Sequence, residues 1–343
     1  MGAREQASVL AGDIGGTKTL LGLFRVEDGM PALVREKHYA TRDFKTLEEV
    51  AADFLGGAAS IAAACFGVPG PIIGGVSHAT NVPWTMEEQA LTRALGVAGA
   101  RLINDLEATA YGMLTLGENE VAVLQPGDSA PPRAPIAVIA AGTGLGEAGL
   151  VPLIDGRWRS VATEGGHADF APRGGEQIAL LEYLSGEFGH VSFERLLSGP
   201  GLVNIYRFLK TRGGAAEPVW LAGQFAAGTD PGAIISEAAL AARDPRCVEA
   251  LGMFVDIYGA EAANLALKYM ALGGVYLGGG IAPKILAALT AGRFVRAFLA
   301  KGRLDKVLAR IPVRVSLNPA AALAGAARCA MELLGEIRVR TRV

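Results

Sequence analysis

The 343-residue sequence has little of what several common kinds of site require. Its three cysteines (Cys65, Cys247 and Cys329) lack the paired spacing of a structural zinc site or a disulfide framework. It has only four histidines, so a histidine-rich metal site is not expected. Charged residues make up 19% of the chain, the net charge is −2, and no basic tract stands out. These values argue against a nucleic-acid partner.

Long hydrophobic runs are also missing. The most apolar stretch, residues 265–280, is interrupted by Lys268 and by several glycines, so no membrane span is expected. Residues 1–8 contain no long apolar run after basic residues, so no signal peptide is visible and a cytoplasmic protein is expected. What the chain does have is 46 glycines and 51% hydrophobic residues, which favours an α/β enzyme with many tight turns.

The most informative segment is the glycine turn between two β-rich runs at residues 8–11 and 20–26. Asp13 ends the first run, Gly15 and Gly16 allow a sharp turn, and a hydroxyl and a cation follow at Thr17 and Lys18. This set suits the phosphates of a nucleotide and their magnesium ion, although a plain tight hairpin has similar glycines. A Walker A loop is excluded because Thr17 replaces its second glycine and a strand, not a helix, follows.

A second glycine turn, residues 141–146, joins a strand at 136–140 to another at 150–154. Gly144, Gly146 and Gly149 have the spacing of a dinucleotide-binding fingerprint, with Glu164 about twenty residues further on. That fingerprint requires a helix to begin within the glycines. A strand is predicted instead, which disfavours a Rossmann fold. The loop at residues 125–135 is rich in Pro, Gly and Ser and marks a domain boundary nearby.

Polar candidates occur where predicted strands end. Asn104 and Asp105 stand between a strand and a helix, where a carboxylate is stabilised by the helix N-terminus and can accept a hydrogen bond from a substrate hydroxyl. Either residue could instead be a helix N-cap. Glu164 and His167 share one short turn and could contact sugar hydroxyls, or they could simply be solvated.

Two further segments leave the same choice between a site and a structural role. Glu187 lies between glycines near a predicted helix end, and Asn81 precedes Trp84 in a loop that offers an amide and an indole N–H. The spacing of Thr85 and Glu88 is that of a capping box, so it predicts a helix beginning there.

Taken together, these residues resemble the bacterial glucokinase family on the actin-like ATPase (ribonuclease H-like) fold. The resemblance covers residues 9–334, and its most distinctive parts are the segments 164–172 (EGGHADFAP) and 188–202 (FGHVSFERLLSGPGL). It implies two α/β domains separated by an interdomain cleft. Residues 1–118 and 318–343 would form the smaller domain, and residues 119–317 would form the larger one.

The resemblance also implies an activity: ATP-dependent phosphorylation of D-glucose at its 6-hydroxyl by a homodimer. Asp105 matches the catalytic base of the family, and Asp13 would hold Mg²⁺ through water. The glucose contacts would be Asn81, Asn104, Asp105, Glu164, His167 and Glu187. The ATP contacts would be Gly12, Asp13, Gly15, Gly16, Thr17 and Lys18 on one turn, Gly142, Thr143 and Gly144 on the other, and Gly278, Gly279 and Gly280, with residues 198–201 close by.

The chain departs from its relatives in one respect and differs from a neighbouring family in another. Many relatives carry asparagine where this chain has Lys18, so the nucleotide contact could differ. The cysteine-rich zinc motif of the related ROK sugar kinases is absent, which favours the glucokinase branch. Three alternatives stay open: a kinase for mannose, fructose or an N-acetylhexosamine, a non-catalytic sugar-sensing regulator, and an actin-like or chaperone ATPase without a small substrate.

Overall fold

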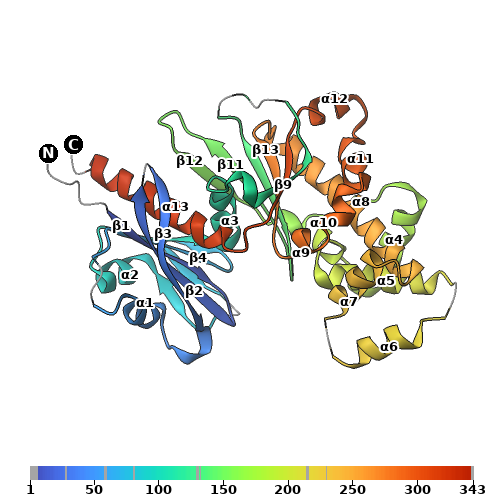
Figure 1. The fold of residues 1–343 in the computed structure, drawn as a ribbon, viewed down its shortest axis with the longest axis horizontal. Coiled ribbons are helices and arrows are strands. Elements are labelled where there is room, and N and C mark those ends of the chain that lie inside the picture. Colours follow the sequence, from blue (N-terminus) through green and yellow to red (C-terminus); the bar gives the residue numbers. More distant parts are fainter. Residues whose placement is uncertain are drawn as a thin grey trace. The chain divides into compact units, whose positions relative to one another are not determined.

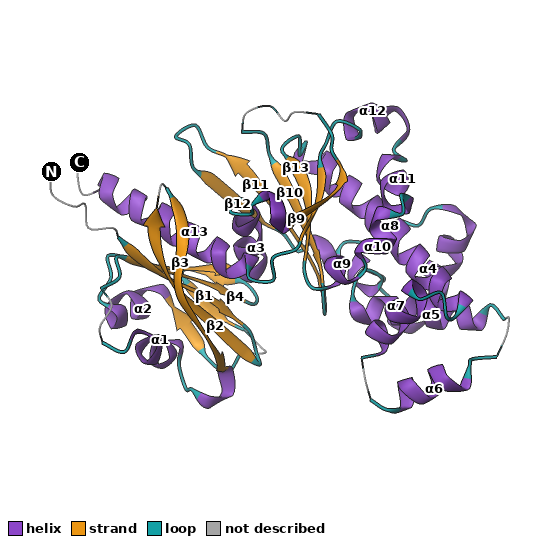
Figure 2. Cartoon of the chain, in the orientation of Figure 1, coloured by secondary structure: helices purple, strands orange, loops and turns teal. Residues whose placement is uncertain are grey.

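The computed structural model describes residues 7–27, 29–57, 60–79, 82–128, 131, 133–213, 216–228 and 230–340, and its fold is shown in Figures 1 and 2. The chain forms two compact units. The first consists of residues 1–120, 153–162 and 318–343, and the second of residues 121–152 and 163–317. Both are α/β, as expected from the sequence.

The first unit contains a five-stranded sheet with the order β3-β2-β1-β4-β8. Its strands are β1 (Ser8–Ile14), β2 (Lys18–Glu27), β3 (Met30–Ala40), β4 (Ala63–Val68) and β8 (Ala100–Asn104). The hairpin β1–β2 is antiparallel, whereas β4 and β8 continue parallel to β1. Every residue of β4 is buried, as is typical of a central parallel strand covered on both faces. The carboxyl ends of β1, β4 and β8 therefore share one edge of the sheet.

Helices cover both faces of this sheet. The helices α1 (Leu47–Leu55) and α2 (Glu88–Leu95) bury Leu47, Phe54 and Leu91 in one core with Leu10 and Phe66 of the sheet. The alternate residues of the same strands point the other way. On that face α3 (Asp105–Met113) and α13 (Ala321–Arg340) contact β1 and β4. A small sheet of β5 (Ile72–Ile73), β6 (Val76–His78) and β7 (Thr85–Glu87) completes the unit.

The prediction that a helix begins at Thr85 is wrong. Residues Thr85–Glu87 form strand β7, and α2 begins at Glu88 without any side-chain cap. Met86 is fully buried and pairs with Ser77 of β6, so burial and strand pairing outweigh a local capping box at this position. The Glu88 carboxylate instead accepts a hydrogen bond from the backbone N–H of Leu102, at 2.9 Å.

The second unit contains strands in the order β11-β10-β13-β14-β9. Their bounds are β9 (Val121–Gln125), β10 (Ile136–Ala141), β11 (Leu145–Pro152), β13 (Gly274–Gly278) and β14 (Val313–Ser316). The hairpin β10–β11 is antiparallel, and β10, β13 and β14 are parallel. Because a strand follows the second glycine turn, the prediction against a Rossmann fold is confirmed. The segment after β11 carries β12 (Trp158–Ala162), which is counted with the first unit.

Helices make up most of the rest of the second unit, as the sequence predicts for residues 176–273. The longest, α8 (Pro245–Tyr269), is buried along most of its length, and its Tyr258 hydroxyl donates to the carbonyl of Ile139 in β10 at 3.3 Å. The others are α4 (Gly174–Phe188), α5 (Gly199–Thr211), α6 (Val219–Ala226), α7 (Pro231–Leu240), α9 (Ile281–Lys284), α10 (Leu286–Thr290), α11 (Arg293–Leu299) and α12 (Asp305–Leu308). No helix in the described part of the chain is long and apolar enough to cross a membrane.

In the first unit, α3 and α13 touch at backbone distance because each presents a glycine to the other. A Cβ added at Gly325 would overlap the carbonyl oxygen of Ala108, and one added at Gly112 would overlap that of Ala321. These obstacles are backbone atoms, which cannot move aside as a flexible side chain can. The backbones of the two helices are therefore in direct contact, and α3 is fixed against α13.

The substitution Gly325→Ala tests this contact. We expect it to lower the free energy of unfolding by about 2–4 kcal/mol, because the added methyl group must push two helices apart. Chemical denaturation monitored by circular dichroism measures the change. Gly335→Ala is the matched control on the same helix: nothing lies within 4 Å of its Cβ position, so better helix propensity should leave stability unchanged or raise it by up to about 1 kcal/mol. Equal effects of the two substitutions would contradict the close approach.

Candidate active site

Three predicted site residues meet at the carboxyl edge of the first sheet. Asp13, near the end of β1, pairs in register with Gly67 of β4, and the next residue of β4, Val68, pairs with Asn104 at the end of β8. Asp105 then begins α3. A Cβ at Gly67 would come within 2.9 Å of the Ala108 side chain, so the glycine allows the first turn of α3 to pack onto β4. Asp13 and Asp105 are thereby brought close together.

The electrostatics of this edge favour a bound cation. Burial, together with the charge of nearby Asp105, raises the pKa of Asp13 to about 6. Two carboxylates that repel each other in a half-buried setting are both stabilised when a cation lies beside them. No three His, Cys, Asp or Glu side chains of the described residues gather as they would around a transition metal. Oxygen ligands in small number, completed by water and phosphate, are instead what Mg²⁺ prefers.

The first glycine turn is closed by its own backbone and braced by the residue that follows β3. The Gly15 N–H donates to the carbonyl of Lys18 at 2.9 Å, and a Cβ on Gly15 would lie 2.9 Å from that same oxygen. The Thr41 hydroxyl donates to the Gly15 carbonyl at 2.7 Å, and its backbone N–H donates to that of Thr17. Thr17 and Lys18 are exposed. A hollow of about 680 Å³ adjoins the turn, lined by Gly16, Thr17, Lys18, His38, Tyr39, Ala40 and Arg42.

Asn104 is the N-cap of α3, which was the alternative to a substrate contact. Its side-chain oxygen accepts from the backbone N–H of Leu106 at 2.9 Å, and its amide donates to the carbonyl of Gly70 at 3.3 Å. Asp105 is exposed, and one of its oxygens accepts from the same Leu106 N–H at 2.8 Å. Asn81 lies outside the described residues. Trp84 is buried and donates its indole N–H to the carbonyl of Phe44, so it packs the loop.

The second unit has its own glycine turn at the carboxyl ends of β10 and β13. The Gly142 N–H donates to the carbonyl of Gly144 at 2.8 Å, and Gly199, which begins α5, donates to the carbonyl of Gly142 at 2.9 Å. Gly279 has a φ of +76° and a Cβ there would overlap the Ala141 carbonyl. The turn, Gly278–Gly280 and the N-terminus of α5 are therefore gathered in one place, as the resemblance implied for residues 198–201. Thr143 lies at the tip of this turn.

The Glu164–His167 turn is a single 3₁₀ turn pressed onto β11. The His167 N–H donates to the Glu164 carbonyl at 3.0 Å, and their side chains lie 4.0 Å apart, 61% and 77% exposed. A Cβ on Gly166 would overlap the Leu145 carbonyl, so the glycine is needed for this contact. The turn thus offers one carboxylate and one imidazole to solvent, side by side, in the pattern that hydroxyl groups of a sugar require.

A buried carboxylate pair lies directly beneath this turn. A Cβ on Gly165 would overlap the Glu147 side chain, which is 1% exposed and has no hydrogen-bond partner among the described residues. Burial, together with the charge of Glu261, raises the pKa of Glu147 to about 8. Lys268 stands 3.6 Å from Glu261 and partly offsets this effect. Glu147 therefore carries a proton at neutral pH.

Glu187 is exposed near the C-terminal end of α4. Short contacts link that end of the helix to the segment that follows the Glu164–His167 turn. His190, three residues further on, makes a 2.9 Å contact from its Nε2 to the carboxylate of Asp169. Backbone bonds from Phe170 to Val191 and from Phe193 to Ala168 fasten the two segments together. The structure thus brings the region of Glu187 toward residues 164–169 within the second unit.

A family model described as "Glucokinase" matches residues 10–333 of the chain. The chain is 40% identical to a glucokinase of Synechocystis sp., over 94% of its own length and 98% of that protein. It is also 40% identical to a glucokinase of Chromobacterium violaceum, over 93% and 88%.

The chain belongs to the glucokinase family.

Solved structures agree with this membership. The crystal structure of a glucokinase from an Antarctic psychrotroph superposes with a TM-score of 0.84 at 31% identity, covering 95% of this chain and 99% of that one. A ROK-family glucokinase from Streptomyces griseus, solved in complex with glucose and AMPPNP, superposes with a TM-score of 0.62 at 23% identity, covering 95% and 100%. At that identity the likeness shows the fold alone: the two-domain actin-like ATPase fold of these sugar kinases.

Two residues that support the predicted site of this glucokinase-family chain were not identified from its sequence. The Glu194 carboxylate accepts from the backbone N–H of Leu145 at 2.9 Å, and a Cβ on Gly144 would lie 2.5 Å from it, so it shapes the second glycine turn. Glu107 caps α3 from inside the helix. The capping-box spacing Asn-x-x-Glu at 104–107 is a signal that could have found Glu107. No local signal points to Glu194, which lies 49 residues from its partner.

The substitution Glu147→Gln tests the buried pair. The pKa of Glu147 in the folded protein is about 8, above the ordinary value of 4.5. As pH rises, Glu147 therefore loses its proton in the unfolded chain before it does so in the folded protein. The wild-type contribution to stability is full below pH 4.5 and is lost progressively up to pH 8. Glutamine does not titrate. We expect the variant to match wild type near pH 4.5 and to be more stable by roughly 1–3 kcal/mol at pH 8, measured by denaturant unfolding.

Asp53→Asn is a control of opposite sign for that experiment. Hydrogen bonds from Lys37 and Tyr39 lower the pKa of Asp53, so its stabilising effect is present at neutral pH and lost as pH falls. The variant should be less stable than wild type at pH 8, with a difference that shrinks in acid. If Glu147→Gln showed no pH-dependent gain while Asp53→Asn behaved as expected, residue 147 would not be a protonated buried acid.

Proposed function

We propose that this enzyme transfers the γ-phosphoryl group of ATP to the 6-hydroxyl of D-glucose, giving ADP and glucose 6-phosphate. The single observation that carries the proposal is the pair of carboxylates, Asp13 and Asp105, beside a glycine turn at the carboxyl edge of a parallel sheet. Ligands of open α/β sheets bind at that edge. The names of the curated relatives, all glucokinases, support the sugar substrate.

The sugar would be bound by the exposed polar groups described above. Glu164 and His167 supply a carboxylate and an imidazole from one turn, and Glu187 supplies a second carboxylate. Asn104 and Asn81 complete the set carried over from the family. Both polar side-chain atoms of Asn104 already have one backbone partner each, so we assign it a contact with sugar through the second N–H of its amide or the second lone pair of its oxygen.

ATP would be bound by the two glycine turns and the Gly278–Gly280 segment. The first turn, Gly12 to Lys18, brings backbone groups, the Thr17 hydroxyl and the Lys18 cation to the phosphates. The second, Gly142 to Gly144, carries the N-terminus of α5 beside it, where partial positive charge favours an anion. Asp13 would hold Mg²⁺ through water, and the bound ion would supply charge neutralisation on the phosphates.

The role of Asp105 follows from its position and from the nature of phosphoryl transfer. This transfer has a loose transition state, so aiming the attacking oxygen matters more than early removal of its proton. Asp105 stands at the first position of α3, and its carboxylate would accept a hydrogen bond from the 6-hydroxyl. The bond from that oxygen to the phosphoryl group forms as the bond to ADP breaks, and the proton passes to Asp105.

Asp105→Asn is the direct test. We expect turnover of glucose to fall by about 10²–10⁴-fold, because the amide cannot take the proton, while ATP still binds. A coupled assay of ADP formation measures the rate, and equilibrium dialysis measures ATP binding. Asp43→Asn, an exposed aspartate of the same unit, is the control and should retain wild-type turnover. Near-normal glucose phosphorylation by Asp105→Asn would remove this residue from the role of base.

The sugar itself is tested with wild-type enzyme. Initial rates with ATP and magnesium over glucose, mannose, fructose and N-acetylglucosamine should give the highest kcat/KM for glucose. Faster turnover of another hexose would replace glucose as the substrate and leave the mechanism standing. ATP consumption that does not depend on any sugar would overturn the proposal.

We also propose that the enzyme works as a homodimer in the cytoplasm. The homodimer rests on the resemblance to the family, and the location rests on the expectation drawn from the sequence. Analytical ultracentrifugation at several protein concentrations tests the first, and a sedimentation coefficient of a monomer at all of them would reject it.

A further inference from the structure

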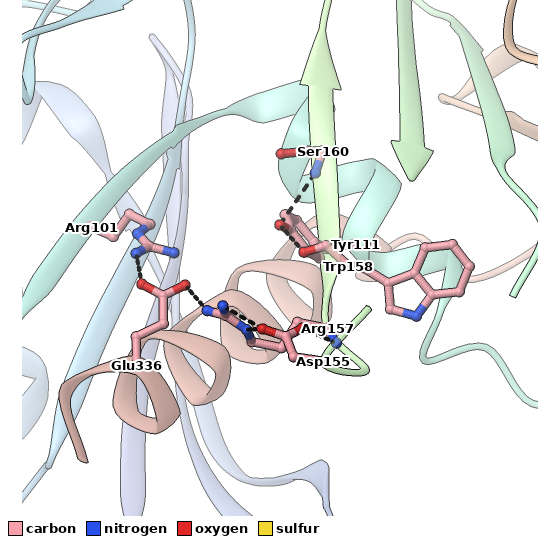
Figure 3. Close-up of polar contacts among 7 residues, drawn as sticks. All are labelled: Arg101, Tyr111, Asp155, Arg157, Trp158, Ser160 and Glu336. Carbon is pink, nitrogen blue, oxygen red and sulfur yellow. Dashed lines mark hydrogen bonds and ion pairs between the residues drawn. The ribbon is translucent and has the colours of Figure 1, made fainter. Parts of the chain in front are cut away.

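Two side chains of α3, one turn apart, hydrogen-bond to strand β12. The hydroxyl of Ser160 donates to Oε1 of Glu107 at 2.5 Å. The Tyr111 hydroxyl donates to the carbonyl of Trp158 at 3.2 Å and accepts from the backbone N–H of Ser160 at 3.3 Å. Figure 3 shows the Tyr111 part of this contact, with the hydroxyl between Trp158 and Ser160. All four residues belong to the first unit.

The Glu107 carboxylate has a second task at its other oxygen. Its Oε2 accepts from the backbone N–H of Asn104 at 3.1 Å, which completes the capping box of α3. One carboxylate therefore joins Ser160 to the residue directly before Asp105. A cap that served only the helix would need the bond to Asn104 and not the one to Ser160.

A hollow adjoins α3 on this side. Glu107, Tyr111 and Ser160 line a hollow of about 930 Å³, together with residues of β8 and α13. On the opposite side, α3 is locked against α13 by Gly112 and Gly325. The hydrogen bonds to β12 therefore hold α3 on the side that faces this hollow.

Strand β12 is itself well anchored. Arg157, just before it, reaches Glu336 of α13 at 2.6 Å, and Glu336 also receives Arg101 of β8 at 2.8 Å (Figure 3). Asp155 holds the same arginine from its own side at 2.6 Å. Ser160 is therefore a fixed point of the first unit. Along the chain it also stands four residues before Glu164.

We propose that Glu107 is a positioning residue: through Ser160 it holds the first turn of α3, and so aims the Asp105 carboxylate. This inference rests on the proposed function of Asp105. Loss of the bond leaves the helix capped and folded, with one fewer contact holding its first turn. A misplacement of the carboxylate by about 1 Å is enough to slow transfer strongly.

The test compares three variants of this contact. Ser160→Ala removes only the bond to Glu107, and we expect kcat for glucose to fall about tenfold with the KM for ATP within about twofold of wild type. Glu107→Ala should fall at least as far. Glu107→Gln should stay near wild type, because its amide can donate to Ser160 while its carbonyl still accepts from Asn104.

Stability controls separate positioning from folding. Glu49→Ala removes the equivalent carboxylate of α1, which accepts from the backbone N–H of Lys45 at 2.9 Å in the same unit. It should lower Tm by a few degrees, about as far as Glu107→Ala, without changing kcat. In an Asp105→Asn background, adding Ser160→Ala should leave the residual rate unchanged, because there is no base left to aim.

The outcomes distinguish this inference from the function beneath it. If wild type does not phosphorylate any hexose, the proposed function fails. If wild type is active and Ser160→Ala keeps full kcat, or if Ser160→Ala slows the Asp105→Asn enzyme as much as it slows wild type, Glu107 is a helix cap only.

Discussion

The first unit depends on the closeness with which α3 approaches its neighbours. Gly67 lets the first turn of α3 rest on β4, and Gly112 and Gly325 let its last turns meet α13 at backbone distance. A helix held on two sides by backbone atoms has little freedom except rotation about its contact line. Asp105 lies at the carboxyl edge of the sheet because three positions elsewhere in the chain have no side chain.

The second unit reaches a similar arrangement with different residues. In each unit a hairpin with a glycine turn contributes one strand that pairs antiparallel on one side and parallel on the other. In the first unit Thr41, directly after β3, braces the turn, and in the second Glu194 and the N-terminus of α5 do so. The shared strand pattern places each turn at the carboxyl edge, while the bracing groups decide its detailed shape.

The sequence predicts those features whose cause is local. Both glycine turns, the strands beside them and the position of Asp105 follow from glycines, an acid and alternating apolar residues within a few positions. The capping-box prediction at Thr85 is wrong because Met86 pairs with Ser77 in a strand, and no local pattern reveals that partner. Glu147 interacts with Glu261, 114 positions away, and Glu194 binds the backbone of Leu145, 49 positions away. Only the folded chain shows these partners. Nothing in the sequence marks residues 153–162 as packing with the first unit.

The order in which β1, β4 and α13 occur along the chain also determines the order in which they emerge during synthesis. Helix α13, which covers β1 and β4, is built from the last residues of the chain, whereas those strands come from its first 70. A ribosome delivers the sheet long before it delivers the cover. During synthesis α3 is the first helix available to cover the apolar face of that sheet, with Val9, Ala11 and Cys65, and α13 emerges some 250 residues after β4. The cover of this face is therefore completed by a segment that lies far along the chain from the strands that it covers.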